Sequence, residues 1–304
     1  MLESYKSGNT LGHSEFPNHG REWVFEKEGV ESSYGALMRR HYKEEAEKHG
    51  FSSHSTMEDE IVRAREIRLI LAFLTYFGPK DGRRNKKVLD LGCGNAYTLN
   101  ILSEAHKDYV YYGVDLSPEL LTIAKKRKLI NCDFLLADGC SIPFSDNSFN
   151  LIYTERCLIN ILDWEAQKSA LHEIDRILEP GGHYLMIECF TDGMENLNRA
   201  RQECGLEELR AAYHNKYFEK KAFFEFVHEK FSVIDPAEID IDARASFQSN
   251  FLSSHYFIAR VLHPLVTRGG NIKNTEFVKF FSFLPPIGNY SQIQAYILKK
   301  REQP

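Results

Sequence analysis

Short apolar runs alternate along this chain with longer segments in which apolar residues recur every three or four positions. The apolar runs predict strands near residues 87–91, 110–114, 133–136, 149–154, 183–189, 231–241 and 291–299. The longer segments predict helices near residues 31–50, 55–77, 96–105, 118–128, 164–178 and 219–230. Strands that alternate with helices are typical of a parallel sheet covered by helices, so the pattern predicts an α/β fold.

A glycine turn follows the first predicted strand, in the run Val88-Leu89-Asp90-Leu91-Gly92-Cys93-Gly94-Asn95-Ala96. Glycines at this place let the backbone approach a ligand closely, just before a helix begins. About twenty residues later the second apolar run ends at Asp115, and an acid there can bind both hydroxyls of a ribose. Together these features predict a nucleoside-bearing cofactor on the first two strands of the sheet.

The glycine turn differs from two other nucleotide-binding patterns. The dinucleotide fingerprint requires a third glycine where this chain has Tyr97. A P-loop ends in Gly-Lys-Ser or Gly-Lys-Thr, whereas this turn continues as Asn95-Ala96-Tyr97-Thr98. The sequence therefore favours a cofactor without a pyrophosphate or triphosphate.

Three further motifs follow the glycine turn and Asp115. They are Ala137-Asp138-Gly139, the run from Ile142 to Ile152, and the turn Leu178-Glu179-Pro180-Gly181-Gly182. This order of motifs over residues 86–190 resembles the class I S-adenosylmethionine-dependent methyltransferases, in particular their type 11 small-molecule group. Ala96 stands where the family usually has a third glycine, and its small side chain still permits close backbone approach.

The resemblance implies a Rossmann-like seven-stranded sheet with helical cap insertions, and S-adenosyl-L-methionine as the cofactor. It also implies a basic residue for the methionine carboxylate on the helix before the core, which carries Arg63, Arg65 and Arg68. Arg65 and Arg68 share a helix face, although a solvated basic stripe is the alternative. The expected cofactor-binding residues are Arg65, Asp90, Gly92, Gly94, Asp115, Leu116, Asp138, Gly139 and Glu155.

The segments outside this core predict a cap over the carboxyl ends of the strands, where ligands of such sheets bind. Residues 1–60 are expected to form an N-terminal lid. A helix predicted within this segment carries an apolar and aromatic face made of Tyr34, Leu37, Met38, His41 and Tyr42. The expected core spans residues 61–241, with a cap insertion near 190–217. Residues 242–288 form a second insertion, and residues 289–304 the final strand and tail.

Composition narrows the class of partner. The chain has 304 residues and a formal net charge of −5, which suits a nucleic-acid-binding surface poorly. Its six cysteines include no C-x-x-C pair, which favours reduced thiols. The first residues lack an apolar signal core, and no apolar stretch approaches the roughly 20 residues of a membrane-spanning helix. We therefore expect a cytoplasmic protein that acts on a small molecule, without nucleic acid or membrane.

The candidate catalytic residues are Glu155, His214 and His255. Glu155 ends the fourth strand, where it can face the acceptor or the methionine ammonium, and the alternative is a structural pair with Arg156. A histidine can remove a proton from a hydroxyl near neutral pH, so His214 and His255 are rival bases, although either can instead belong to the cap. No metal is expected; Glu155 with Glu188 and Asp192 is the alternative oxygen-ligand set.

The preferred function is methyl transfer from S-adenosylmethionine to a polar small molecule, as O-methylation of a sugar or of a natural-product or glycan intermediate. One alternative is a protein or RNA methyltransferase. The other is a non-catalytic cofactor-binding partner subunit. The sequence leaves open the acceptor, the methylated atom and the oligomeric state.

Overall fold

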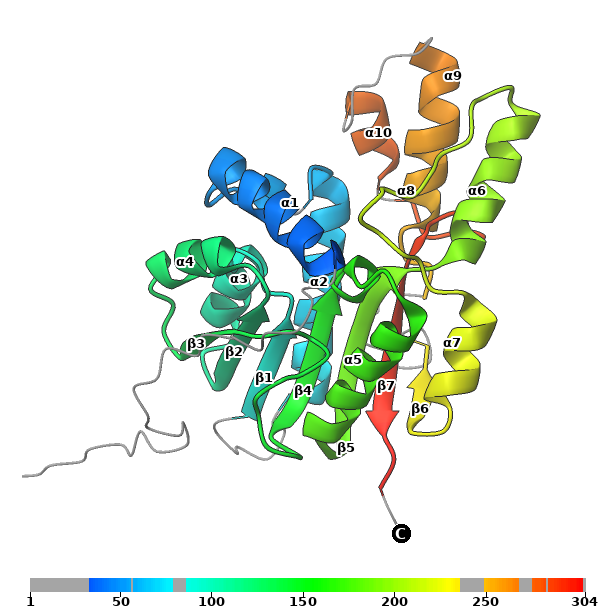
Figure 1. Ribbon diagram of the computed structural model, residues 1–304. Coiled ribbons are helices and arrows are strands. Elements are labelled where there is room, and N and C mark those ends of the chain that lie inside the picture. The colour runs from blue at the N-terminus through cyan, green and yellow to red at the C-terminus, as the bar shows by residue number, and fades with distance from the viewer. Residues whose placement is uncertain are drawn as a thin grey trace, which may run out of the picture.

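The computed structural model of the chain describes residues 33–55, 57–78, 86–235, 249–267, 275–282 and 284–302. The described part contains a seven-stranded sheet of order β3-β2-β1-β4-β5-β7-β6 (Figure 1). The strands are β1 (Lys86–Leu91), β2 (Tyr109–Asp115), β3 (Cys132–Leu136), β4 (Phe149–Glu155), β5 (Leu178–Cys189), β6 (Phe231–Ile234) and β7 (Ile293–Lys300). Strands β1 to β5 run parallel, and β7 lies antiparallel between β5 and β6.

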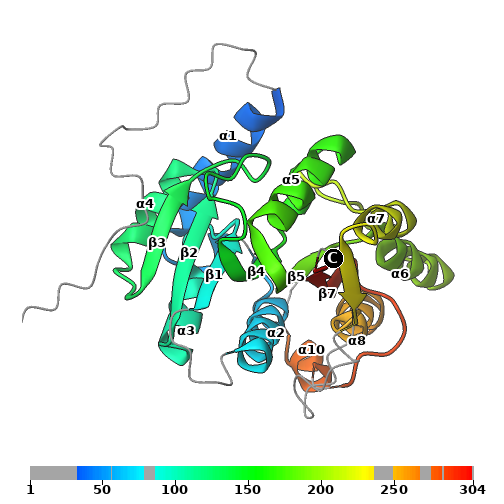
Figure 2. The ribbon, with the colours of Figure 1, turned by 90° about the horizontal axis from the view of Figure 1, so that it is seen from below.

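The described α-helices lie on both faces of this sheet and at the carboxyl ends of its parallel strands (Figure 1 and Figure 2). They are α1 (Ser33–His49), α2 (Glu60–Phe77), α3 (Tyr97–Ala105), α4 (Pro118–Lys126), α5 (Trp164–Ile177), α6 (Thr191–Glu203), α7 (Lys220–Val227), α8 (Ser253–Phe257), α9 (His263–Thr267) and α10 (Glu276–Phe281). Figure 2 shows α2 and α3 on one face and α5 and α7 on the other. The predicted α/β fold with a Rossmann-like seven-stranded sheet is therefore confirmed.

The centre of the sheet is buried on both faces. Val88, Leu89, Ile152, Tyr184 and Leu185 have almost no exposed surface, as expected for strands enclosed between two helical layers. The strands therefore form a rigid base, and the loops at their carboxyl ends are placed at one edge of it.

The second helix starts later than the sequence predicted. Asp59, rather than Ser55, caps α2, because its Oδ1 accepts hydrogen bonds from the backbone N–H groups of Ile61 and Val62 at 3.1 and 3.2 Å. Gly78 follows its last turn, where the sequence predicted the end.

The additions to the core lie at the carboxyl ends of the parallel strands. Figure 1 shows α1, α6 and the helices α8 to α10 at this end of the sheet. The sequence predicted a strand over residues 231–241, and within the described residues strand β6 ends at Ile234. Residues 1–32 of the predicted N-terminal lid and parts of the second insertion lie outside the described residues, and the division into core and cap stays a prediction. Within the described ranges, no helix has the length and apolar character needed to cross a membrane.

Candidate cofactor-binding and active site

A cavity of about 260 Å³ lies at the carboxyl ends of β1 to β4. Its wall is built from the loops that follow these strands, from α1, and from Arg63 on α2. Eight of the nine expected cofactor-binding residues line it: Asp90, Gly92, Gly94, Asp115, Leu116, Asp138, Gly139 and Glu155. The sheet thus gathers motifs that are up to 65 residues apart in the chain (155 − 90) around one cavity.

The glycine turn has a backbone that ordinary residues rarely adopt. Gly92 has φ +85°, and a Cβ added to it would lie 2.5 Å from the Cys157 Sγ. Gly94 and Ala96 also have positive φ, of 53° and 57°. The turn is joined to β2, because the N–H groups of Gly92 and Cys93 both donate to the Val114 carbonyl, at 2.7 and 3.0 Å. The turn therefore packs closely against Cys157 and the end of β2, and its predicted close approach to a ligand stays a prediction.

Asp115 connects the glycine turn to the end of β2. Its Oδ2 accepts from the Gly94 N–H at 2.7 Å, and its Oδ1 accepts from the Ser117 N–H at 2.8 Å. Burial raises the pKa of Asp115, and these backbone hydrogen bonds oppose the rise. The carboxylate lines the cavity in a fixed orientation, as required of a group that binds ribose hydroxyls.

Asp90 and Asp138 mark the ends of two other strands. Asp90 is buried, and burial raises its pKa well above the ordinary range, with Tyr153 on the adjacent strand acting in the opposite direction. Asp138 follows β3, and its Oδ1 accepts from the Cys140 N–H at 2.8 Å, which shapes the turn beside Gly139. Together with Asp115 they form the half of the cavity over β1, β2 and β3.

The β4 end of the cavity holds a buried cluster of charges. Arg63 Nη1 donates to Glu155 Oε1 at 2.7 Å, and Thr98 Oγ1 donates to Glu155 Oε2 at 2.8 Å. Arg156 Nη1 lies 3.7 Å from Glu155 Oε1 and also pairs with Glu66 of α2. Burial would raise the pKa of Glu155, but the two guanidinium groups outweigh it and hold this pKa below its usual value. Glu155 is therefore an ionised acceptor of hydrogen bonds and a weak base.

Helix α1 closes the cavity from above. Its residues Met38, Arg39 and Tyr42 line the cavity, and the Asn160 amide donates to the Tyr42 hydroxyl at 2.5 Å. Part of the segment predicted to be an N-terminal lid thus contacts the cavity, and its role as a lid stays a prediction.

The segment after α1 is tied to the glycine turn. Asn95 Nδ2 donates to the carbonyls of Gly50 and Ser52 at 2.7 and 2.9 Å. Arg127 Nη2 donates to the Phe51 carbonyl at 2.6 Å. Asn95 of the glycine turn and Arg127 after α4 therefore hold the segment of residues 50–52, which follows α1, beside the cavity.

Three candidate residues from the sequence lie outside the cavity wall: Arg65, His214 and His255. Arg65 points away, and its Nη1 donates to the Phe251 carbonyl at 3.1 Å. The sequence expected Arg65 to bind the methionine carboxylate, but the arginine that α2 directs into the wall is Arg63.

The two candidate histidines are held by other contacts. His255 is buried with its Nε2 3.1 Å from Asp59 Oδ2, the same carboxylate group that caps α2. His214 stacks on His41 of α1 with ring centroids 4.2 Å apart, and burial lowers its pKa, as does His41. Neither imidazole is placed to take a proton from a group inside the cavity.

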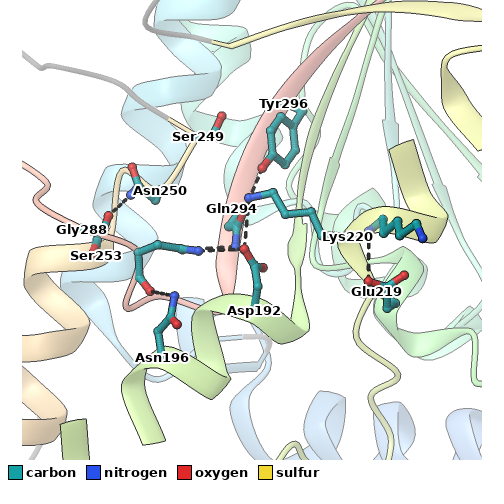
Figure 3. A network of polar contacts seen from close by, with 12 residues as sticks. Asp192, Asn196, Glu219, Lys220, Ser249, Asn250, Ser253, Gly288, Gln294 and Tyr296 are labelled. Carbon is teal, nitrogen blue, oxygen red and sulfur yellow. Dashed lines mark hydrogen bonds and ion pairs between the residues drawn. The ribbon is translucent and has the colours of Figure 1, made fainter. Parts of the chain in front are cut away.

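The three carboxylates considered as metal ligands are kept apart. Glu188 accepts hydrogen bonds from the backbone N–H groups of residues 157, 158 and 159, and burial raises its pKa to about 7. Asp192 instead contacts Lys220, Asn289 and Gln294 (Figure 3). The described residues contain no group of three or more His, Cys, Asp or Glu side chains arranged to hold a metal ion.

Thr98 and Asn160 line the cavity without having been anticipated, and Arg63 lines it although Arg65 was the arginine chosen from the three candidates on this helix. A signal for Arg63 was present, because it lies four and seven residues before Ile67 and Ile70 and so on their buried helix face. Thr98 lies in the first turn of α3, directly after the glycine turn. Nothing in the local sequence marks Asn160, which reaches the site through the turn that follows β4.

Comparison with known proteins finds relatives among methyltransferases. Residues 88–182 match the family described as "Methyltransferase domain". Demethylmenaquinone methyltransferase of Staphylococcus epidermidis is 36% identical over 110 residues, which cover 35% of this chain and 44% of that protein. A probable tRNA methyltransferase 9B of Mus musculus is 31% identical over 120 residues, covering 40% of this chain and 25% of that protein. The chain thus matches less than half the length of these curated relatives.

A solved structure shows the same fold over a longer stretch. Phosphoethanolamine N-methyltransferase 1 of Haemonchus contortus, in complex with phosphoethanolamine and S-adenosylhomocysteine, has a TM-score of 0.55 and 13% identity. The match covers 89% of this chain and 49% of that one. The motifs, their positions around one cavity and the sheet order agree with the match of residues 88–182 to the methyltransferase domain, and they are those of a class I S-adenosylmethionine-dependent methyltransferase fold.

Proposed function

We propose that this protein transfers a methyl group from S-adenosylmethionine to an oxygen of a polar small molecule, such as a sugar or a natural-product or glycan intermediate. The observation that carries the proposal is the polar end of the cavity over β4, where Arg39, Tyr42, Arg156 and Asn160 lie beyond Arg63 and Glu155. Polar side chains that converge on an enclosed space fix the orientation of a polar ligand.

The other half of the cavity fits the cofactor. The backbone at Gly92 leaves space that a Cβ would fill, and Asp115 presents a carboxylate beside it. Asp115 would bind the ribose hydroxyls, the turn at Asp138 and Gly139 would contact the adenine, and Arg63 and Glu155 would face the charged methionine groups. When bound, the cofactor supplies an electrophilic methyl group on a sulfonium leaving group.

The protein's part in this chemistry is positioning and exclusion of water. In-line displacement at a methyl group needs the acceptor atom aligned and close, and this is where an enclosed site contributes most. Met38, Arg39 and Tyr42 of α1 cover the cavity, which suits a small acceptor better than an extended chain of RNA or protein.

The first test separates binding from turnover. We expect titration calorimetry to detect binding of S-adenosylmethionine, and fractionated metabolite pools to stimulate release of S-adenosylhomocysteine above the rate without acceptor. Fractions of peptides or RNA run in parallel serve as controls. Turnover with only RNA or peptide would overturn the small-molecule proposal, and binding without turnover on any fraction would favour a non-catalytic subunit.

A further inference from the structure

Two histidine rings connect helix α1, which lies over the cavity, to the segment that precedes α7. His41 of α1 stacks on His214, with ring centroids 4.2 Å apart and ring planes inclined by 26°. Tyr213 packs edge-on against both imidazoles, with its ring centroid 6.3 Å from that of His41 and 5.0 Å from that of His214. The next residue of α1, Tyr42, packs edge-on against His41 and lines the cavity. The stacked pair is therefore a direct contact between α1 and the rest of the molecule.

The His214 side of this contact is fixed to the core. The Lys216 N–H donates to the Ile159 carbonyl at 2.7 Å, and the Lys216 carbonyl accepts from Gln167 Nε2 at 3.0 Å. Gln167 is buried in α5 and also donates to the Leu158 carbonyl at 3.1 Å. A change in the histidine pair is therefore expected to displace α1 rather than the segment that carries His214.

Neither imidazole of the pair has a carboxylate beside it. Among the described residues, the histidines with a carboxylate oxygen within 4.0 Å are His49, His54 and His255. Glu45 lies one helical turn after His41, but it pairs with His49 at 3.6 Å. A proton on each ring of the pair would thus place two positive charges about one ring-stacking distance apart, with no adjacent acid to offset their repulsion.

The charged side chains on the elements that meet at the pair include one further acid of α1. These side chains are Arg39, Arg40, Lys43 and Glu44 on α1, Arg156 after β4, and Arg210 and Lys216 beside His214. Glu44 is exposed, and in the described part of the chain no ion pair joins it to either imidazole. The electrostatic partner that matters for each ring is therefore the other ring.

The protonated form of His214 also leaves a donor unsatisfied. Its Nδ1 is buried and has no hydrogen-bond partner in the described structure. A neutral imidazole can present a lone pair at this nitrogen, whereas the charged ring carries N–H donors on both nitrogens, and a buried unpaired donor costs free energy. Burial lowers the pKa of His214, and the neighbouring His41 lowers it further. The stacked arrangement thus favours a neutral His214.

We propose that the His41–His214 stack is a pH-sensitive contact that holds α1 over the cavity near neutral pH and releases it in acid. Because the pKa of His214 in the stack lies below its ordinary value, the stack stabilises the closed arrangement fully above about pH 6.5. This stabilisation is lost as the pH falls through the lowered pKa. Release of α1 removes Met38, Arg39 and Tyr42 from the cavity wall, so a bound cofactor loses contacts.

The test measures the affinity for S-adenosylmethionine by calorimetry at about pH 7.5 and about pH 5.5. Between these values we expect the Kd of the native protein to rise about tenfold more than that of His214→Phe, which keeps a stacking ring that takes no proton. His172→Phe removes an exposed histidine of α5 and should behave like the native protein. The comparison cancels the titration of the cofactor and of the carboxylates around the cavity, which all three proteins share.

Hydrogen–deuterium exchange reports the release of α1 directly. After correction for the intrinsic effect of pH on exchange, uptake by residues 38–49 should increase at about pH 5.5 in the native protein and in His172→Phe, but not in His214→Phe. His41→Phe gives the same comparison from the other ring if His214→Phe does not fold. An equal rise in Kd in native protein and His214→Phe, or no added uptake by α1 in acid, overturns the proposal. Neither experiment contains a methyl acceptor, so both leave the proposed reaction untouched.

Discussion

Asp115→Ala is expected to weaken S-adenosylmethionine binding at least about 100-fold in titration calorimetry. Two hydrogen bonds from ribose hydroxyls to a charged group contribute about 1.5–3 kcal/mol each, and each 1.4 kcal/mol is a factor of about ten in affinity. The substitution also removes the acceptor for the N–H groups of Gly94 and Ser117, while the hydrogen bonds from Gly92 and Cys93 to the Val114 carbonyl still join the glycine turn to β2.

Two further variants isolate the ribose contacts. Asp133→Ala removes an exposed carboxylate from the neighbouring strand β3 and should bind S-adenosylmethionine like the native protein. Asp115→Asn retains an oxygen that can support the turn and should lie between the two. A folded Asp115→Ala protein, verified by its thermal unfolding, that binds S-adenosylmethionine with native affinity would refute the assignment of this carboxylate to the ribose.

Gly92→Ala is expected to destabilise the protein by about 3 kcal/mol and to abolish measurable cofactor binding. The positive φ of Gly92 costs a residue with a side chain about 1–2 kcal/mol, and forcing atoms into a packed site costs about 1–3 kcal/mol more. The new Cβ would lie 2.5 Å from Cys157 Sγ and 2.6 Å from Cys157 Cβ, so the turn must shift away from β4. The measurements are urea unfolding and calorimetry with S-adenosylmethionine.

The two causes can be separated with a matched glycine. Gly205 has φ +69° and no atom within 4 Å of an added Cβ, so Gly205→Ala should show only the backbone cost. Adding Cys157→Gly to Gly92→Ala removes both clashing atoms and should restore part of the lost stability. Equal destabilisation by Gly92→Ala and Gly205→Ala would mean that the close approach to Cys157 has no energetic role.

The parts of the site built from local sequence could be predicted, because strand, turn and acid are contiguous there. Asp90, Gly92, Gly94 and Asp115 lie where the order of motifs placed them, since parallel strands bring their carboxyl ends to one edge. Arg65 was chosen because it shares a helix face with Arg68, whereas Arg63, on the buried face with Ile67 and Ile70, is the arginine that lines the cavity.

The histidines show where residue type alone is insufficient. His214 and His255 have side chains suited to proton transfer, but their partners, His41 and Asp59, come from segments more than 150 residues earlier in the chain (214 − 41 = 173; 255 − 59 = 196). The position of α1 over the cavity is equally non-local: its amphipathic face was visible in the sequence, but the surface it covers was not. Contacts of this kind depend on how the additions pack onto the sheet.

The hydrogen bonds from Asn95 and Arg127 to the carbonyls of Gly50, Phe51 and Ser52 have a consequence for ligand exchange. Breaking all three costs about 3 kcal/mol in total, at roughly 1 kcal/mol each. If the N-terminal segment acts as the predicted lid, a free-energy gap of this size leaves it open in about one per cent of the molecules at any instant. We then expect thermal motion to be sufficient for a reactant to enter and a product to leave.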